Sequence, residues 1–386
     1  MLTMENLPIE LLIYIFNYVP NHIISISQVC RYFNSVATEQ TRKISINFHR
    51  ESEKHIENVS KQLENFKGLK SLDVKLGFDV NIAEKADFCA IHSNKITHLT
   101  LSDFSFLNPF FDKLNVIYSN LDTLVIENSD LTSSSDDLPD FIIKSCSNLK
   151  NLKISGCSGL EIDSLNAIGQ NLCNTKIEKL ELYPTYSYFD MSRQNNRDES
   201  WTIENLHTLS VRSKLVVMKK NFVRNMLGNK RKFPKMKKLE LIAELNFGNN
   251  FISVLTQQFP NLECLSIGKG VMDVHNQDFT TICNQYKSLR ALEFHFIHQD
   301  EQLDLRYLQN NQCITKLTIG LTKEISHDDL QIISKCLPNL THLSVILYYL
   351  ISSNKDYLEQ LIKTFSNVKQ IYFSHIGMLE RIKIKL

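Results

Sequence analysis

Apolar and polar residues alternate in a short motif that recurs along most of the chain. The motif is Leu-x-x-Leu-x-Leu, in which Ile, Val, Met or Phe also take the apolar positions, as in "LKSLDV" and "LTHLSV". Its copies begin at residues 69, 96, 121, 149, 177, 206, 236, 262, 289, 314, 340 and 368, with a degenerate copy, "TRKISI", at 41. Starts 25 to 30 residues apart indicate a repeat array rather than unrelated elements.

Each repeat is predicted to be a strand followed by a helix. The fourth and sixth motif positions place two apolar side chains on one face of a strand. Apolar residues then recur at helical spacing in 162–172, 250–259, 327–337 and 356–365. Parallel neighbours need such a long crossover, so the pattern predicts an α/β fold with a parallel sheet whose core is shared by stacked repeats. Because strands are spaced more closely than helices, the stack should curve, with its strands inside and its helices outside.

The two ends of the chain depart from this repeat. Near the N-terminus, Pro8 suits the first position of a helix, and an apolar stripe at helical spacing follows it. Residues 1–40 predict three short helices, too small a domain to bury all of this apolar surface alone. The surface should therefore meet the first repeat, a partner protein, or both. At the other end, residues 379–385 follow the last motif too closely for a crossover helix, so they should turn back as an antiparallel closing strand.

Composition narrows the function. The chain of 386 residues has 43 Lys and Arg against 42 Asp and Glu, so no global field favours nucleic acid or a membrane surface. Its 9 cysteines are scattered and form no Cys-x-x-Cys pair, which predicts reduced thiols in a cytoplasmic or nuclear protein. Cys146, Cys283 and Cys336 sit near expected helix ends, where packed thiols fit better than zinc ligands. No apolar run reaches the length that spans a membrane.

Sequence motifs of catalysis are missing from the chain. It has no phosphate-binding glycine loop, no Gly-x-Ser-x-Gly and no His-Glu-x-x-His. His295 and His298 form an isolated pair without further ligands. We therefore expect no enzyme activity, no cofactor and no metal.

Two segments interrupt the repeats and are candidates for target recognition. Residues 183–205 bring aromatic residues and the single Trp201 into a polar context, either as interface anchors or as cover for a missing helix. Residues 212–238 are rich in Lys and Arg and contain no acid, which indicates an acidic or phosphorylated partner, a nuclear import signal, or only a solvated helix face and turn. The predicted target-binding residues are Tyr183, Tyr186, Tyr188, Arg212, Lys214, Lys219 and Lys220.

The inner face of the sheet is the other candidate surface. The third and fifth motif positions should face solvent there, and charges of both signs adjoin one another in the middle repeats. Lys153 beside Glu181 is one pair that would satisfy itself across neighbouring strands. His295, His342 and Tyr372 mark a second possible site on the C-terminal part of this face.

Residues 41–386 closely resemble leucine-rich repeats of the long, helix-containing type. The N-terminal sequence "LPIELLIYIFNYVP", followed by "VCRYFNSVA", resembles the F-box, although Phe33 stands where Trp is commonest. The fold implied is a three-helix F-box at 1–40 and a curved solenoid with a parallel inner sheet at 41–386. The F-box resemblance implies docking on a Skp-type adaptor through the residues Leu7, Pro8, Leu11, Leu12, Ile15, Phe16, Val29 and Cys30.

Together the two resemblances imply a non-catalytic substrate receptor of a cullin–RING ubiquitin ligase, whose repeats hold the target protein. A scaffold that uses its F-box without promoting ubiquitination remains an alternative. An enzyme is a third possibility, with only the length of the chain in its favour. The sequence names no target.

Overall fold

The computed structural model describes the greater part of the repeats. The described residues are 41–47, 61, 63–75, 89, 93–103, 111, 114, 117–131, 137–159, 176–183, 205–218, 233–245, 251–268, 276–295, 303–321, 325–347, 363–365, 368–375 and 381–385. The contacts divide the chain into two compact units, Met1–Ser187 and Tyr188–Leu386. The predicted F-box helices and the eight predicted adaptor-binding residues lie outside the described residues.

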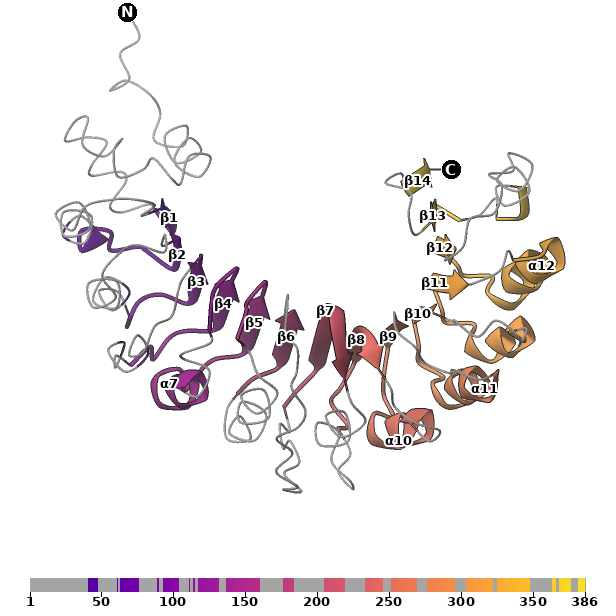
Figure 1. The fold of residues 1–386 in the computed structure, drawn as a ribbon, viewed down its shortest axis with the longest axis horizontal. Helices are drawn as coiled ribbons and strands as arrows, with labels where there is room; N and C mark the ends of the chain where they lie inside the picture. Colours follow the sequence, from indigo (N-terminus) through magenta and orange to yellow (C-terminus); the bar gives the residue numbers. More distant parts are fainter. Residues whose placement is uncertain are drawn as a thin grey trace, which may run out of the picture. The chain divides into compact units, whose positions relative to one another are not determined.

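In the first unit the described strands form a parallel sheet in chain order (Figure 1). The strands are β1 (Lys43–Asn47), β2 (Ser71–Lys75), β3 (His98–Ser102), β4 (Thr123–Glu127), β5 (Asn151–Ser155) and β6 (Lys179–Tyr183). Each begins at the third residue of its motif, and equivalent motif positions are opposite one another, as in the pair Leu124 and Leu152. The apolar positions therefore line up in rows across the strands, as the repeat predicts.

The second unit repeats this order. Its strands are β7 (Thr208–Met218), β8 (Lys238–Leu245), β9 (Cys264–Gly268), β10 (Ala291–His295), β11 (Lys316–Leu321), β12 (His342–Leu347), β13 (Gln370–His375) and β14 (Arg381–Lys385). Strands β7 to β13 pair in parallel, each with the next. Strand β14 pairs antiparallel with β13, within the segment 379–385 that the sequence assigns to a closing strand.

Helices cover one face of each sheet (Figure 1). They are α7 (Asp137–Ser145) in the first unit, and α10 (Phe251–Gln258), α11 (Asn276–Gln285), the 3₁₀ helix η4 (Leu305–Asn311) and α12 (His327–Cys336) in the second. Helices α10 and α12 match predicted segments, and 162–172 lies outside the described residues. Helix α12 begins at a capping box in which Ser326 and Asp329 each satisfy the other's backbone N–H. In the part of the chain that is described, no helix has the length and apolarity to cross a membrane.

The leucines of the motif form the core. Leu99, Leu124, Leu180 and Leu239 are completely buried, and so are most other residues at the fourth and sixth positions. Cys146 and Cys283 are also buried, and burial raises the pKa of each thiol to about 12. Each thiol is therefore protonated at neutral pH. The predicted role as a packed thiol is confirmed for these two cysteines, whereas Cys336 is only half-buried.

Backbone hydrogen bonds outside the sheet ladder hold the repeats in register. The carbonyl of Arg290, at the second motif position, accepts the amides of Thr315 at 2.8 Å and Lys316 at 3.1 Å from the next repeat. The same pair of bonds reaches the carbonyls of Arg42, Lys70, Thr97, Asp122, Lys150, His207, Lys237, Glu263 and Thr315. The register therefore depends on the backbone at this position and not on the side chain that it carries.

The start of the basic segment 212–238 differs from one expectation. The sequence allows a solvated helix and turn in this segment, but residues 212–218 are not part of a helix, because β7 continues to Met218, and residues 219–232 lie outside the described residues. Its pairing with β8 shifts register between Arg212 and Val217, so an irregular stretch separates the two parts of the ladder. The high content of β-branched and other apolar residues in "KLVVM" suits a strand as well as a helix, and pairing with β8 decides between them.

Two buried tyrosines provide a matched test of this packing. The Tyr118 hydroxyl donates a 2.8 Å hydrogen bond to the Cys89 carbonyl, whereas the Tyr286 hydroxyl has no partner in the described part of the chain. We expect Tyr118→Phe to lower the free energy of unfolding by about 1 kcal/mol because it removes a buried hydrogen bond. Tyr286→Phe should leave that free energy unchanged or raise it, because an unsatisfied hydroxyl is removed. Thermal and denaturant unfolding of both variants would measure this, and an equal loss in each would contradict it.

Candidate binding surface

The polar motif positions lie on the face of each sheet away from the buried leucines. In β4 and β5 the third and fifth residues are half-buried while the fourth and sixth are buried. Helices cover the opposite face, so this inner face is the one that the fold leaves for contact with a partner (Figure 1).

In the first unit, most of the described lysines of this face are neutralised by carboxylates, and the exposed Lys70 is an isolated exception among the described residues. The ion pairs are Lys43–Asp73 at 2.6 Å, Lys75–Asp103 at 2.6 Å, Lys150–Asp122 at 3.2 Å, Lys153–Glu127 at 2.6 Å and Lys179–Glu181 at 2.9 Å. Most of them join neighbouring strands, in the manner of cross-strand pairs. Exposed pairs of this kind contribute little stability, but they leave little net charge for a ligand to meet.

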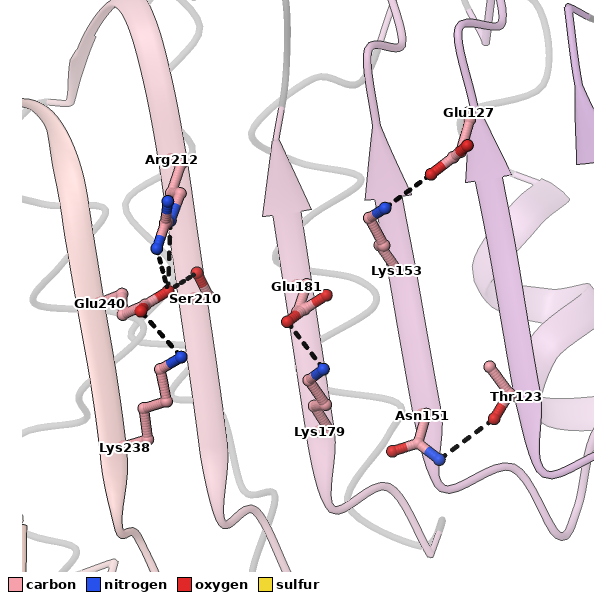
Figure 2. Close-up of polar contacts among 10 residues, drawn as sticks. All are labelled: Thr123, Glu127, Asn151, Lys153, Lys179, Glu181, Ser210, Arg212, Lys238 and Glu240. Carbon is pink, nitrogen blue, oxygen red and sulfur yellow. Dashed lines mark hydrogen bonds and ion pairs between the residues drawn. The ribbon is translucent and has the colours of Figure 1, made fainter. Parts of the chain in front are cut away.

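The pairing differs in detail from the sequence expectation for Lys153. Lys153 and Glu181 are opposite each other in register, yet the Lys153 ammonium binds Glu127 on the other side, while Glu181 binds Lys179 on its own strand (Figure 2). The hydrogen bond to Glu127 is the main reason why the pKa of Lys153 is raised. This part of the face does satisfy itself, but with partners that strand register alone does not identify.

In the second unit, a buried carboxylate organises the first strands. Glu240 accepts hydrogen bonds from Ser210 at 2.5 Å and Arg212 at 3.2 Å, and it forms an ion pair with Lys238 at 2.8 Å (Figure 2). The expectation that fifth positions face solvent is wrong here, since Ser210, Glu240 and Ser266 have exposed fractions of 0%, 7% and 5%. These side chains are short or are covered by the longer cations that bind them.

The charge of Glu240 follows from these contacts. Burial alone would raise its pKa, but the hydrogen bonds from Lys238 and Ser210 and the charge of Arg212 outweigh burial. The pKa of Glu240 therefore lies below its ordinary value, and the carboxylate is ionised at neutral pH. A carboxylate with this many donors is occupied within the protein, so the group acts as a structural centre of the face.

From β10 to β13 the pattern of neutralised charge ends. Arg290, Lys316 and Lys369 are exposed, and none of them forms an ion pair or a side-chain hydrogen bond with any residue that the structure describes. Arg290 and Lys369 occupy the second motif position, and Lys316 occupies the third. Two acids lie near this edge. Glu263 pairs with Lys237 at 2.9 Å, and its pKa is lowered mainly by Lys237 and to a smaller extent by the charge of Arg290; Glu293 in β10 accepts a hydrogen bond from Ser266 at 2.5 Å. We call Arg290, Lys316, Lys369 and His342 the basic cluster.

His342 lies within this cluster. Its pKa is lowered first by burial and then by the positive charges of Lys316 and Lys369, so both lysines lie close to the ring. The Thr341 hydroxyl donates to the Thr315 carbonyl at 2.9 Å and lies 2.8 Å from Nδ1 of His342. Since that hydroxyl has a single proton, Nδ1 of the neutral ring must donate, and Nε2 is left as the nitrogen that protonation would convert to a donor.

Few of the predicted target-binding residues can be located. Tyr183 is half-buried at the end of β6. Arg212 is in β7, where its guanidinium binds Glu240 and is not available as a free cation. Lys214 lies in the same strand, but its side chain is outside the described part of the structure. Four of the predicted residues lie wholly outside the described residues: Tyr186, Tyr188, Lys219 and Lys220. The proposed union of these residues in one site remains a prediction.

Arg290 and Lys369 were missed because the sequence argument examined only the third and fifth positions. The second position does contain a signal for them. Its acids are Asp122, Glu178 and Glu263, so from Arg290 onward this position carries basic residues and no acid that could neutralise them. Among the described residues, no three His, Cys, Asp or Glu side chains gather as metal ligands would.

Comparison with known proteins adds evidence for the N-terminal region. Residues 4–44 match the F-box-like family. No curated protein sequence matches the chain. Among solved structures, the chain is similar to one in the yeast Rad7–Elc1 complex, with 13% identity over 81% of this chain and 72% of that one and a TM-score of 0.47. It is also similar to the leucine-rich repeat-containing protein LegL7 of Legionella pneumophila, with 14% identity over 88% and 92% of the two chains and a TM-score of 0.38.

Both structural similarities are weak, so the description of the two regions of the chain rests on the repeat itself and on the family match. The repeat gives the described strands and their buried leucines, and the family match covers the N-terminal segment. The chain therefore combines an F-box-like segment at residues 4–44 with a leucine-rich repeat fold in the part that follows.

Proposed function

We propose that the chain is a non-catalytic substrate receptor of a cullin–RING ubiquitin ligase. The observation that carries the proposal is the F-box-like match at residues 4–44, followed directly by leucine-rich repeats. In this proposal the F-box docks on a Skp-type adaptor and the inner face of the repeats holds the target. The chain contributes proximity, because a bound target is presented to the transferring enzyme at a high effective concentration.

The junction between the two regions supports this division of labour. The F-box-like match ends at residue 44, inside strand β1, so no linker separates the match from the sheet. Ile44 is buried, and β1 is in register with β2 along its whole length. Residues 41–44 therefore belong both to the F-box-like match and to the sheet, so the sequence has no separate linker between the two regions.

The test is affinity capture of the whole tagged chain from cells. We expect a Skp-type adaptor, a cullin and a RING subunit in the captured material, together with a target whose half-life lengthens when the chain is depleted. Capture of the adaptor without cullin, with no protein stabilised on depletion, would instead indicate a scaffold that uses the F-box outside a ligase. Absence of the adaptor would refute both forms of the proposal.

A further inference from the structure

The described lysines and arginines of the inner face fall into two groups. From β1 to β9 most of them, such as Lys153 with Glu127 and Lys237 with Glu263, have a carboxylate within about 3 Å, and the exposed Lys70 beside β2 is an isolated lysine without one among the described residues. Arg290, Lys316 and Lys369, on or beside β10, β11 and β13, have none among the residues that are described. Unneutralised cations on neighbouring strands raise the local potential even in a chain whose net charge is only +1.

We propose that the basic cluster is the docking site for an acidic segment of the target protein. The inference rests on the proposed function, because it takes the repeats to be the part that holds the target. The occupant follows from charge complementarity: carboxylate or phosphate groups would supply the partners that the cluster lacks. The cluster reaches from β10 to β13, about 14 Å at the usual strand spacing, which suits about four or five residues of extended chain.

The local geometry is suited to an anion. The second motif position adjoins the third, so Arg290 lies beside Ala291, which is opposite Lys316 in register, and Lys316 is opposite His342. Since Nδ1 of His342 is directed to Thr341, its Nε2 is the nitrogen left for a ligand, and protonation would make it a further donor.

The sequence-predicted site competes with this one, and the structure favours the basic cluster. Arg212 is the predicted target-binding cation that can be located with its side chain, and it is bound to Glu240 at 3.0 Å. Using it for a target would require that pair to break and would leave the buried Glu240 carboxylate with fewer donors. Arg290, Lys316 and Lys369 would gain a partner without losing one.

The test measures binding of labelled peptides to the purified whole chain by fluorescence anisotropy. The probes are a glutamate-rich peptide, a peptide carrying phosphoserines, and a glutamine-rich peptide of equal length. Both acidic peptides should bind, more weakly as salt rises, and the neutral peptide should not. The tighter of the two acidic probes identifies carboxylate or phosphate as the preferred group.

The decisive variant combines Arg290→Gln, Lys316→Gln and Lys369→Gln. We expect acidic-peptide affinity to fall by about tenfold, that is about 1.4 kcal/mol, with a flatter salt dependence. The matched control combines Lys287→Gln, Lys335→Gln and Lys363→Gln, which removes the same charge from exposed lysines in or near the helices of the same repeats. The control should remain within about twofold of the unmodified chain. Melting curves of both variants would show that the fold is kept.

His342 offers an independent readout by NMR. The pKa of His342 is lowered by burial and by the charges of Lys316 and Lys369, so an acidic peptide bound in the cluster should raise it. The other polar residues near the ring are Gln370 and Tyr372 on β13. His98 is the internal reference, because its Nδ1 also lies 2.8 Å from the preceding threonine hydroxyl. The ring signals of His98, which lies outside the basic cluster, should not respond to the peptide.

Several results would overturn the inference. One is equal binding by the cluster variant and its control, and another is binding of the neutral peptide as tight as that of the acidic ones. A loss caused instead by Lys214→Gln with Lys219→Gln and Lys220→Gln would place the site in the basic segment, as the sequence predicts. Tighter, charge-dependent binding of a single-stranded oligonucleotide would indicate nucleic acid. Adaptor capture by the cluster variant should be unchanged, so failure of the site and failure of the ligase proposal are distinguishable.

Discussion

Replacing Leu11 and Ile15 together by aspartate is expected to abolish capture of a Skp-type adaptor by the whole chain. Both residues belong to the apolar stripe of the F-box-like segment. In a docked complex each new carboxylate would enter an apolar contact without a partner, at a cost of several kcal/mol per group. A total cost of this size exceeds what a micromolar complex can absorb.

The control for this experiment adds the same charge at polar positions. Asn17→Asp with Asn21→Asp introduces two carboxylates off the stripe and should leave adaptor capture intact. Far-ultraviolet circular dichroism and melting of both double variants would show whether the repeats remain folded. Adaptor recovered with the Leu11 and Ile15 variant at the level of the control would refute the docking assignment.

Truncating one core leucine in each unit should destabilise the repeats around it. Leu124 in β4 and Leu317 in β11 are almost completely buried, so Leu→Ala at either site should cost about 2–5 kcal/mol of unfolding free energy. Because each repeat in a stack contacts mainly its neighbours, the effect should be strongest nearby. Hydrogen exchange of Leu124→Ala should quicken first in β3 to β5, and that of Leu317→Ala first in β10 to β12.

The two leucine variants serve as controls for each other. They make the same chemical change at the same motif position, so any difference in exchange reflects location. Equal acceleration of exchange in all strands by either variant would contradict local coupling and would mean that the described repeats unfold as one cooperative block.

The strands were predictable because buried leucines mark them directly. The fourth and sixth positions are buried in each strand from β2 to β12, and this fixes where each strand begins and which residues pair. The antiparallel direction of β14 was also predictable, because the segment between β13 and β14 is too short to contain a crossover helix. Where apolar periodicity was ambiguous, as in residues 212–218, the chain extended a strand beyond the motif.

Polar contacts were much less predictable, because a long charged side chain can reach several partners and no periodicity in the sequence specifies which one it binds. Lys153 turns to Glu127 although Glu181 is opposite it, and Glu240 becomes buried under the cations that bind it. The basic cluster depends on which carboxylates are already occupied, and a sequence does not contain that information. A count of acids along the second motif position would still have indicated that unneutralised cations lie between β10 and β13, because the last acid at this position is Glu263.

The hydrogen bonds at the second motif position have a consequence for how such a protein changes over evolutionary time. The Arg290 carbonyl accepts two amides of the next repeat, while the Arg290 side chain forms no ion pair or hydrogen bond in the part of the chain described. A substitution at such a position alters what the face recognises and leaves the attachment of the repeats untouched. Proline is the exception, since it would remove the amide that Thr315 or Lys316 donates. Recognition can therefore diverge faster than the scaffold, with specificity for new partners acquired one side chain at a time.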